Sequence, residues 1–245
     1  MQPSAIISLV PSLTELLFDL GLGDHVIGRT RFCVHPKDQI ENVPIVGGTK
    51  NPRLDKIREL NPDLIIANKE ENRQEDVEEL EQDFDVLVTE IATTEEALFA
   101  IHDIGWTCGV PEKAKTLIHD IQQEMERVPD EPVMKAAYFI WRDPWMSVGN
   151  DTYIHSVMSH WKLENVYANK ARYPRTSLHE LSLKKPEIIL LSSEPYPFKE
   201  KHIKEVSDAC PGSNIVLVNG EWFSWYGSRM QKAFRHLNVF RRAIS

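Results

Sequence analysis

The sequence contains little cysteine and no excess of basic residues, and each scarcity excludes a class of protein. Its three cysteines, Cys33, Cys108 and Cys210, lie far apart and form no CxxC pair. Such a sparse set argues against a disulfide framework and mildly favours a reducing compartment. Lysine and arginine total 28 against 37 aspartates and glutamates, which gives a formal net charge of −9. A protein that follows nucleic-acid phosphates normally has the opposite balance, so we expect no nucleic-acid partner.

Long hydrophobic runs are also missing. No segment approaches the roughly 20 apolar residues that span a bilayer, so we expect no membrane insertion. The chain begins at Met1 and passes at once into an apolar segment over 5–10. It shows neither the basic region nor the cleavage site of a signal peptide. The sequence as given therefore predicts a cytoplasmic protein.

Metal-binding and catalytic motifs are absent from the sequence as well. Cys33 and His35 are only two positions apart, and no HxH, HExxH or CxxC motif supplies the further ligands that a zinc site needs. The phosphate-binding and nucleophile motifs GxxxxGK[ST], GxGxxG and GxSxG do not occur. We therefore predict no resident metal, no cofactor and no catalytic residue.

What the chain does contain is an alternation of short apolar runs and helical patterns. Hydrophobic residues make up 42% of the 245 positions and charged residues 27%, which is ordinary for one large or two small globular domains. The alternation predicts βα units and mostly parallel sheets. The expected strands are 5–10, 26–28, 64–67, 86–88, 136–141, 188–191 and 215–218. The expected helices are 13–20, 54–60, 77–84, 95–107, 152–161, 178–183 and 229–240.

Helix starts have recognisable signals in the sequence. Ser12, Thr93 and Ser177 each begin a pattern typical of a capping box, with an acidic residue three positions later. Asn51 followed by Pro52 predicts a cap and a proline in the first turn of the next helix.

An internal repeat is the most informative feature of the chain. Leu54 precedes the pair Pro62-Asp63 by eight positions, and Leu178 precedes Pro186-Glu187 by the same spacing, about half a chain later. Each copy predicts a helix, a proline break and a buried strand, and therefore two similar lobes. A further helix from 111 to about 127 connects them. We predict an N-terminal α/β lobe over 1–108, a linking helix over 109–130 and a C-terminal α/β lobe over 131–245.

Tryptophan is unevenly placed. Five of the six tryptophans lie in the second half, and four of these, Trp141, Trp145, Trp222 and Trp225, fall in predicted loops at strand ends. In open parallel sheets, ligands bind beyond the carboxyl ends of the strands. Flat rings there suit stacking on a large planar or apolar ligand. The alternative is that they cap the core beneath the loops.

Taken together, the residues resemble the class III solute-binding proteins of ABC importers, which have two Rossmann-like lobes joined by one long helix and bind cobalamin, haem or ferric siderophores. The resemblance covers nearly the whole chain. It rests on the segment 7–16, the run Val46-Gly47-Gly48, the two repeat copies, and Glu221-Trp222-Phe223. The last is similar to an acidic-Trp-Phe loop of the cobalamin-binding branch.

The resemblance implies a ligand cleft between the lobes and a docking surface for a permease. It places Phe32, Thr49, Lys50 and Asn68 at the cleft from the first lobe, and Tyr173, Arg175, Glu221, Trp222 and Trp225 from the second, with Trp141 and Trp145 nearby. Asn68 stands where cobalamin binders tend to have an aromatic residue. For docking, it implies Asp55 in one lobe and, in the other, His179 with Glu180 beside it, where the family usually has glutamates.

The leading hypothesis is a monomeric, non-enzymatic binding protein for a large metal chelate, cobalamin-like or else a ferric siderophore or haem, acting in ABC-type uptake. It would be periplasmic if a signal has been removed. A cytosolic corrinoid carrier or sensor without a permease is one alternative. Another is a cytosolic enzyme that uses Cys33, His35 or Glu221. A protein-interaction module using the acidic segment 70–81 is a third.

Overall fold

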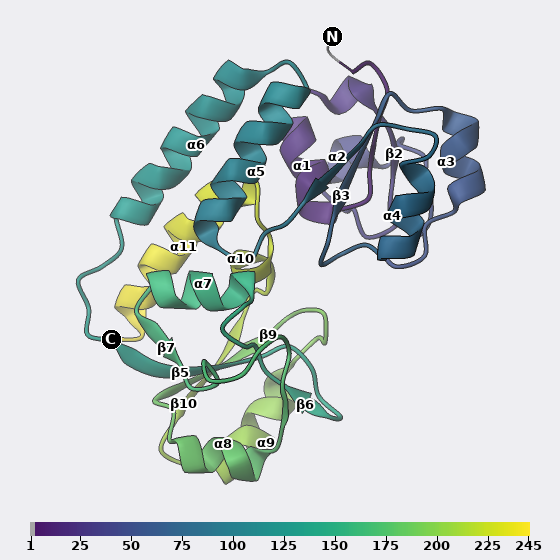
Figure 1. The fold of residues 1–245 in the computed structure, drawn as a ribbon. Coiled ribbons are helices and arrows are strands. Elements are labelled where there is room, and N and C mark those ends of the chain that lie inside the picture. Colours follow the sequence, from purple (N-terminus) through teal and green to yellow (C-terminus); the bar gives the residue numbers. More distant parts are fainter. Residues whose placement is uncertain (1–2) are drawn as a thin grey trace. The chain divides into compact units, whose positions relative to one another are not determined.

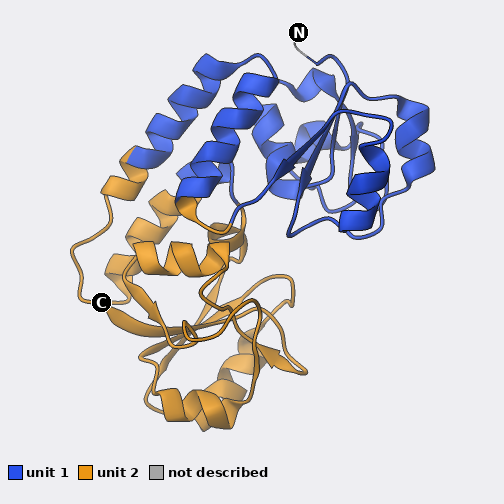
Figure 2. Ribbon diagram, in the orientation of Figure 1, with its two compact units in different colours: residues 1–91, 95–122, 226–231 blue, residues 92–94, 123–225, 232–245 orange. Residues whose placement is uncertain are grey.

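The computed structural model describes residues 3–245, which form two compact units (Figure 2). Unit 1 comprises residues 1–91, 95–122 and 226–231, and unit 2 comprises 92–94, 123–225 and 232–245. Each unit contains a four-stranded sheet in which all neighbouring strands run parallel. The predicted fold class, two α/β lobes with parallel sheets flanked by helices, is confirmed.

Unit 1 has the strand order β2-β1-β3-β4. Its strands are β1 (Ile6–Ser8), β2 (Val26–Arg29), β3 (Leu64–Asn68) and β4 (Val86–Thr89). Its helices are α1 (Pro11–Asp19), η1 (Gly23–His25), α2 (Lys37–Ile40), α3 (Leu54–Leu60), α4 (Gln74–Leu80), α5 (Thr94–Thr107) and the first part of α6 (Pro111–Glu126). Residues Ile7, Ile57, Ile65 and Leu80 form part of one buried cluster, so α3 and α4 cover the same face of the sheet.

Unit 2 has the strand order β10-β9-β5-β7 and a separate antiparallel ribbon, β6-β8. Its strands are β5 (Met134–Phe139), β6 (Trp145–Met146), β7 (Leu163–Asn165), β8 (Arg175–Thr176), β9 (Ile188–Ser192) and β10 (Asn214–Val218). Its helices are α7 (Tyr153–His160), α8 (Leu178–Lys184), α9 (Glu200–Ala209), α10 (Glu221–Ser224) and most of α11 (Arg229–Ala243). In Figure 1, α7 lies on one face of this sheet and α8 and α9 lie on the other.

Of the four predicted helix starts, one is confirmed and two are wrong, while Thr93 stands directly before α5, which begins at Thr94. Ser177 caps α8, because its hydroxyl accepts from the Glu180 amide at 3.1 Å. Ser12 lies inside the first turn of α1, which begins at Pro11 with Val10 as its N-cap. Asn51 is not a cap either: the N-cap of α3 is Arg53, whose amide donates to the Val46 carbonyl at 2.7 Å and so extends the preceding turn.

The internal repeat is present in three dimensions. Helices α3 and α8 both have seven residues, and both end at a residue in the left-handed region, Asn61 with φ 49° and Lys185 with φ 50°. A proline and a five-residue strand follow in each copy, and both strands, β3 and β9, are buried along their whole length. Burial on both faces is what a parallel strand between two layers of helices requires.

The acidic residue of each repeat copy fixes the start of a neighbouring strand. Asp63 donates its amide to the Ala5 carbonyl at 2.8 Å, while its carboxylate accepts from the Ala5 amide at 3.0 Å. Glu187 makes the same reciprocal pair with Lys135, with both distances at 2.8 Å. The acidic residue after each proline therefore sets the register between β1 and β3 and between β5 and β9.

The segment 226–231 is held in unit 1 by a bidentate ion pair. Arg229 donates from Nη2 and Nε to the two carboxylate oxygens of Glu15 in α1, at 2.6 and 2.7 Å. Both side chains are largely buried. Burial raises the pKa of Glu15, and the hydrogen bond from Arg229 acts in the opposite direction. A buried pair of this kind is costly to break, since either partner alone is left as an uncompensated charge.

We expect Asp63→Asn to lower the urea midpoint at pH 7 and to make stability less sensitive to acid. Hydrogen bonds from the Ser4 hydroxyl and the Ser4 and Ala5 amides hold the pKa of Asp63 below its usual range. An acid with a depressed pKa stabilises the fold above its unfolded pKa of about 3.9, and this contribution is lost as the pH falls through the folded pKa. Asparagine cannot ionise, so urea unfolding of the variant should weaken less below pH 4. The exposed Asp24→Asn serves as the control, and equal behaviour of the two variants would contradict the role of Asp63.

Candidate ligand-binding site

Three of the predicted residues of unit 1 lie at the carboxyl end of its sheet, around Asn72. The Asn72 side-chain amide donates to the carbonyls of Thr49 at 3.0 Å and Leu9 at 3.3 Å, and its oxygen accepts from the Asn68 amide at 2.9 Å. Lys50 donates from Nζ to the Glu70 carbonyl at 2.5 Å. Asn72 therefore connects the turn that carries Thr49 and Lys50 to the loop after β3.

Asn68 serves this loop with its side chain. It is 1% exposed; its Nδ2 donates to Oγ1 of Thr89 at 3.0 Å, and its Oδ1 accepts from the Glu70 amide at 2.8 Å. Both the nitrogen and the oxygen of this buried side-chain amide are hydrogen-bonded within the protein. The side chain therefore holds the surrounding backbone and does not present an unpaired polar group to a ligand. The structure thus gives Asn68 a role in holding the rim of the sheet, and contact with a ligand stays a prediction.

Phe32 is the exposed aromatic residue of this edge. It follows β2 and is 51% exposed. The guanidinium carbon of Arg31 lies 5.4 Å from its ring centroid, within the range of a cation–π contact. An exposed ring beside a cation is a surface on which an apolar or anionic ligand can rest.

The tryptophans of unit 2 divide into two kinds. Trp145 packs against the buried cluster of this sheet: its ring stacks on Phe198 at 5.7 Å and meets Phe139 edge-on at 5.1 Å. Trp141 is 39% exposed and meets Tyr196 edge-on at 5.8 Å. The core-capping alternative therefore describes Trp145, whereas Trp141 keeps an open face.

Two further tryptophans lie in and directly after helix α10, at the carboxyl end of β10. Trp222 stacks on His236 of α11, with centroids 4.8 Å apart and planes within 10°. Trp225 follows the helix, and its indole Nε1 donates to Oε1 of Glu194 at 3.0 Å. Both rings are half-buried, and Glu221 is the first residue of the same helix. Glu221, Trp222 and Trp225 are therefore brought together within one short helix and the residue that follows it.

Arg175 is the first residue of β8, which pairs with β6, and Tyr173 lies two positions before it. The guanidinium carbon of Arg172 lies 5.6 Å from the Tyr173 ring centroid, and Arg175 is exposed opposite Met146. These two predicted residues belong to the small ribbon, a separate element from α10.

Sequence reasoning missed Asn72 and Glu194, the two polar residues that organise these edges. Both come soon after the central strand of their sheet, at four positions beyond β3 and two beyond β9. The repeat predicted both strands. The signal that could have identified these residues is therefore a polar residue shortly after the strand in each copy. Their partners are distant in sequence, and nothing local indicated the contacts.

Cys33, one of the residues proposed for an enzyme, does not have the environment of an activated nucleophile. The Cys33 thiol is fully buried between the hydroxyls of Thr14 at 3.1 Å and Thr30 at 3.2 Å. Burial raises its pKa, which keeps it in the unreactive thiol form. Among residues 3–245, no group of three or more His, Cys, Asp or Glu side chains is arranged to hold a metal ion.

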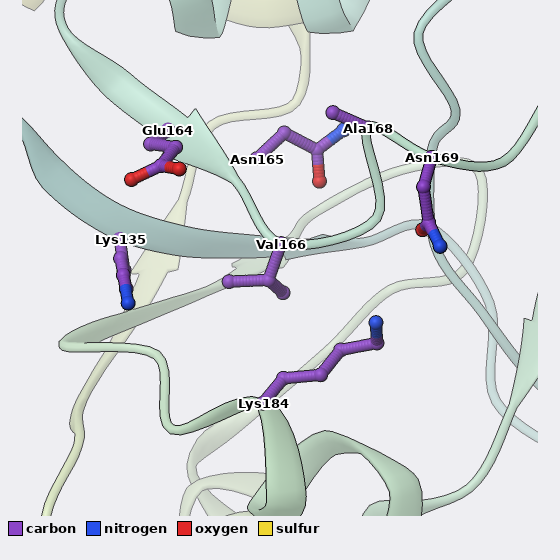
Figure 3. Close-up of a pocket in the computed structure, with 7 residues that line it drawn as sticks. All are labelled: Lys135, Glu164, Asn165, Val166, Ala168, Asn169 and Lys184. Atoms are coloured by element: carbon purple, nitrogen blue, oxygen red, sulfur yellow. The ribbon is translucent and has the colours of Figure 1, made fainter.

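A hollow elsewhere on unit 2 contains none of the predicted residues. It lies beside the edge strand β7 and the start of β5, and Figure 3 shows the side chains of Lys135, Glu164 and Lys184 around it. The mixture of two cations and one carboxylate at this surface does not match an aromatic-lined site.

The predicted docking residues occupy equivalent places in the two repeat copies. Asp55 is exposed in the first turn of α3, and His179 is exposed in the first turn of α8. Glu180 is half-buried and accepts from the Thr176 hydroxyl at 3.0 Å. In unit 2, the exposed member of the predicted pair is therefore the histidine.

We expect all three thiols to be unreactive in the native protein. Cys33, Cys108 and Cys210 are buried, and burial raises the pKa of Cys108 to about 11. Because the thiolate is the reacting species, a thiol-specific disulfide reagent at pH 8 should label none of them in minutes and all three after unfolding in urea. Rapid native labelling of Cys33 would revive it as a nucleophile.

The sequence comparisons agree with this architecture. The model of the periplasmic binding protein family matches residues 6–209. The vitamin B12-binding protein of Photorhabdus laumondii is 25% identical over 241 residues, covering 96% of this chain and 86% of that protein. An uncharacterized ABC transporter substrate-binding lipoprotein of Bacillus subtilis, YvrC, is 26% identical over 204 residues, covering 77% and 63% of the two chains.

Solved structures show the same fold. The periplasmic vitamin B12 binding protein BtuF of Vibrio cholerae superposes with a TM-score of 0.85 at 21% identity, covering 99% of this chain and 98% of that one. The periplasmic heme-binding protein RhuT from Roseiflexus sp. RS-1 also gives 0.85, at 19% identity and 99% of both chains. None of the helices in residues 3–245 is long and apolar enough to cross a membrane. With its two parallel-sheet units and a family match over most of its length, the chain belongs to the periplasmic binding protein family.

Proposed function

We propose that this protein binds a large metal chelate with a flat macrocyclic face, most specifically a corrinoid such as cobalamin, and hands it to an ABC-type importer. The observation that carries the proposal is the aromatic surface formed by Trp222 in α10 and Trp225 directly after it. Trp222 is held by its stack on His236, and Trp225 is held by its bond to Glu194. Rings that are fixed before binding lose little conformational entropy on contact, which favours affinity for a flat ligand.

The names of the relatives support the same ligand class. The Photorhabdus relative is a vitamin B12-binding protein, and the structural neighbours include B12- and heme-binding proteins. Phe32 and the rim around Thr49 and Lys50 would add contacts from unit 1, which stays a prediction from the resemblance. The chelate is cargo in this proposal, and no resident cofactor takes part.

We infer that the protein is not an enzyme. The thiol of Cys33, one of the three residues that the enzyme alternative names, is buried with a raised pKa. Glu221 begins α10 beside Trp222, where a carboxylate suits hydrogen bonding to a ligand. The importer role would place the protein outside the cytoplasm, and its relatives include a periplasmic protein and a lipoprotein.

Trp222→Ala should weaken chelate binding at least ten-fold. Removing a half-buried tryptophan from the centre of a binding surface typically costs about 2 kcal/mol or more. Calorimetric titration with cyanocobalamin, hemin and a ferric catecholate siderophore would name the ligand and measure the loss. Trp106→Ala, which removes an exposed ring from α5 of unit 1, is the matched control and should bind like the wild type. Absence of binding to all three chelates would overturn the proposed function.

For delivery, we propose that the first turns of α3 and α8 contact the permease. Charge reversal at Asp55 or Glu180 should lower whole-cell uptake of radiolabelled cyanocobalamin at least five-fold and leave its Kd unchanged, because charged docking contacts depend on sign and geometry. Glu59→Lys, at an exposed position near the end of α3, is the control. Normal uptake by the Asp55 and Glu180 variants would exclude this surface and favour a carrier without a permease.

A further inference from the structure

The loops after β9 and β10 are joined to each other within unit 2. These strands are neighbours in the sheet, so their carboxyl ends emerge side by side. The Gly220 amide donates to the Ser193 hydroxyl at 3.0 Å. A Cβ at Gly220 would lie 2.4 Å from Cγ of Glu194 and 2.5 Å from Oγ of Ser192. The two loops therefore approach so closely that only glycine fits between them.

Glu194 is the centre of this contact. Its Oε1 accepts from the Ser224 hydroxyl at 2.7 Å and from the Trp225 indole nitrogen at 3.0 Å. Ser224 and Trp225 are the last residue of α10 and the one after it. One carboxylate oxygen thus ties the carboxyl end of β9 to the end of the aromatic helix.

The backbone of Glu194 is fixed from the core. Ser192, the fully buried last residue of β9, donates its hydroxyl to the Glu194 carbonyl at 2.6 Å and accepts from the Glu194 amide at 3.2 Å. The same hydroxyl accepts from the buried Tyr138 phenol at 3.0 Å. A continuous chain of bonds therefore runs from Tyr138 in β5 through Ser192 and Glu194 to Trp225.

We propose that Glu194 is a positioning and specificity-determining residue of the ligand site, acting through Trp225. This inference rests on the proposed function. A hydrogen bond to a charged acceptor is stronger than one to a neutral group, so it holds the indole in one orientation. The negative charge next to Nε1 also enriches the π face of the ring. Such a face favours a planar ligand that carries a cation, such as a chelated metal ion, over a neutral apolar one.

A double-mutant cycle tests the coupling. The variants are Glu194→Ala, Glu194→Gln, Trp225→Phe and Glu194→Ala with Trp225→Phe, titrated with whichever of cyanocobalamin or hemin the wild type binds. Glu194→Ala should weaken binding about ten-fold, the loss of one charge-assisted hydrogen bond. Glu194→Gln keeps an acceptor and should lie between wild type and alanine. In the Trp225→Phe background, which lacks the indole N–H, Glu194→Ala should change Kd less than two-fold.

A control variant for this cycle is available in the same sheet. Glu164→Ala removes an exposed carboxylate from β7 and should leave Kd unchanged. A Kd within two-fold of wild type for Glu194→Ala, or an equal loss with and without the Trp225 indole, would overturn the proposal. In both cases the wild type still binds, so the proposed function stands.

A measurement without ligand separates the two claims further. In ¹H–¹⁵N spectra of the free protein, Glu194→Ala should move the Trp225 indole resonance strongly. The Trp161 indole, which donates to Oδ1 of Asn238 at 2.9 Å in the core of unit 2, should stay in place. An unmoved Trp225 resonance would refute the positioning role. Failure of the wild type to bind any chelate would instead refute the proposed function.

Discussion

Parallel pairing of the strands is the constraint on which the rest of this structure depends. Each strand of the two main sheets runs alongside its neighbours in the same direction, so the chain must return through a crossover before every new strand. The crossovers cover both faces, which is why β3 and β9 are buried along their whole length. The same geometry gives the two ends of each sheet different tasks. Asp63 and Glu187 set the register at the amino end, and the polar and aromatic loops gather at the carboxyl end.

In each unit a buried or half-buried polar side chain holds the loops at the carboxyl end of the sheet, and its chemistry differs between the two copies. In unit 1 the neutral amide of Asn72 bonds to backbone carbonyls, which holds loops and leaves no net charge. In unit 2 the carboxylate of Glu194 bonds to a hydroxyl and an indole, which holds side chains and adds a negative charge. The two copies of the repeat therefore have similar backbones, but the side chains at their carboxyl ends differ in charge and in hydrogen-bond partners. Fixed backbone in one unit and fixed rings in the other are features that a preorganised binding protein requires.

The sequence predicted most strands, most helices and the repeat, because hydrophobic period and proline spacing are local properties. It missed the short strands β6, β7 and β8 and the helix α9. It failed at Ser12 and Asn51, where neighbouring residues, Pro11 and the turn around Val46, decided where the helix begins. It failed in a different way at Asn72 and Glu194. Their importance lies in partners such as Leu9 and Trp225, 63 and 31 positions away. No periodicity in the sequence indicates such pairs. The sequence could therefore place the candidate site at the carboxyl ends of the strands, but it could not predict the hydrogen bonds within it.

The tryptophans show why residue type alone does not identify a binding surface. Trp161 is buried, and its indole bonds to Asn238, which is buried as well, so the ring belongs to the core. Trp145 is half-buried, yet Phe139 and Phe198 occupy its surroundings. Trp222 and Trp225 are also half-buried, but a histidine and a carboxylate hold them from one side. A ring fixed by polar partners at the end of a sheet stays ordered without being covered. Under the proposed function, that combination, more than aromatic content, is what would distinguish a surface prepared for a flat ligand from the lid of a core.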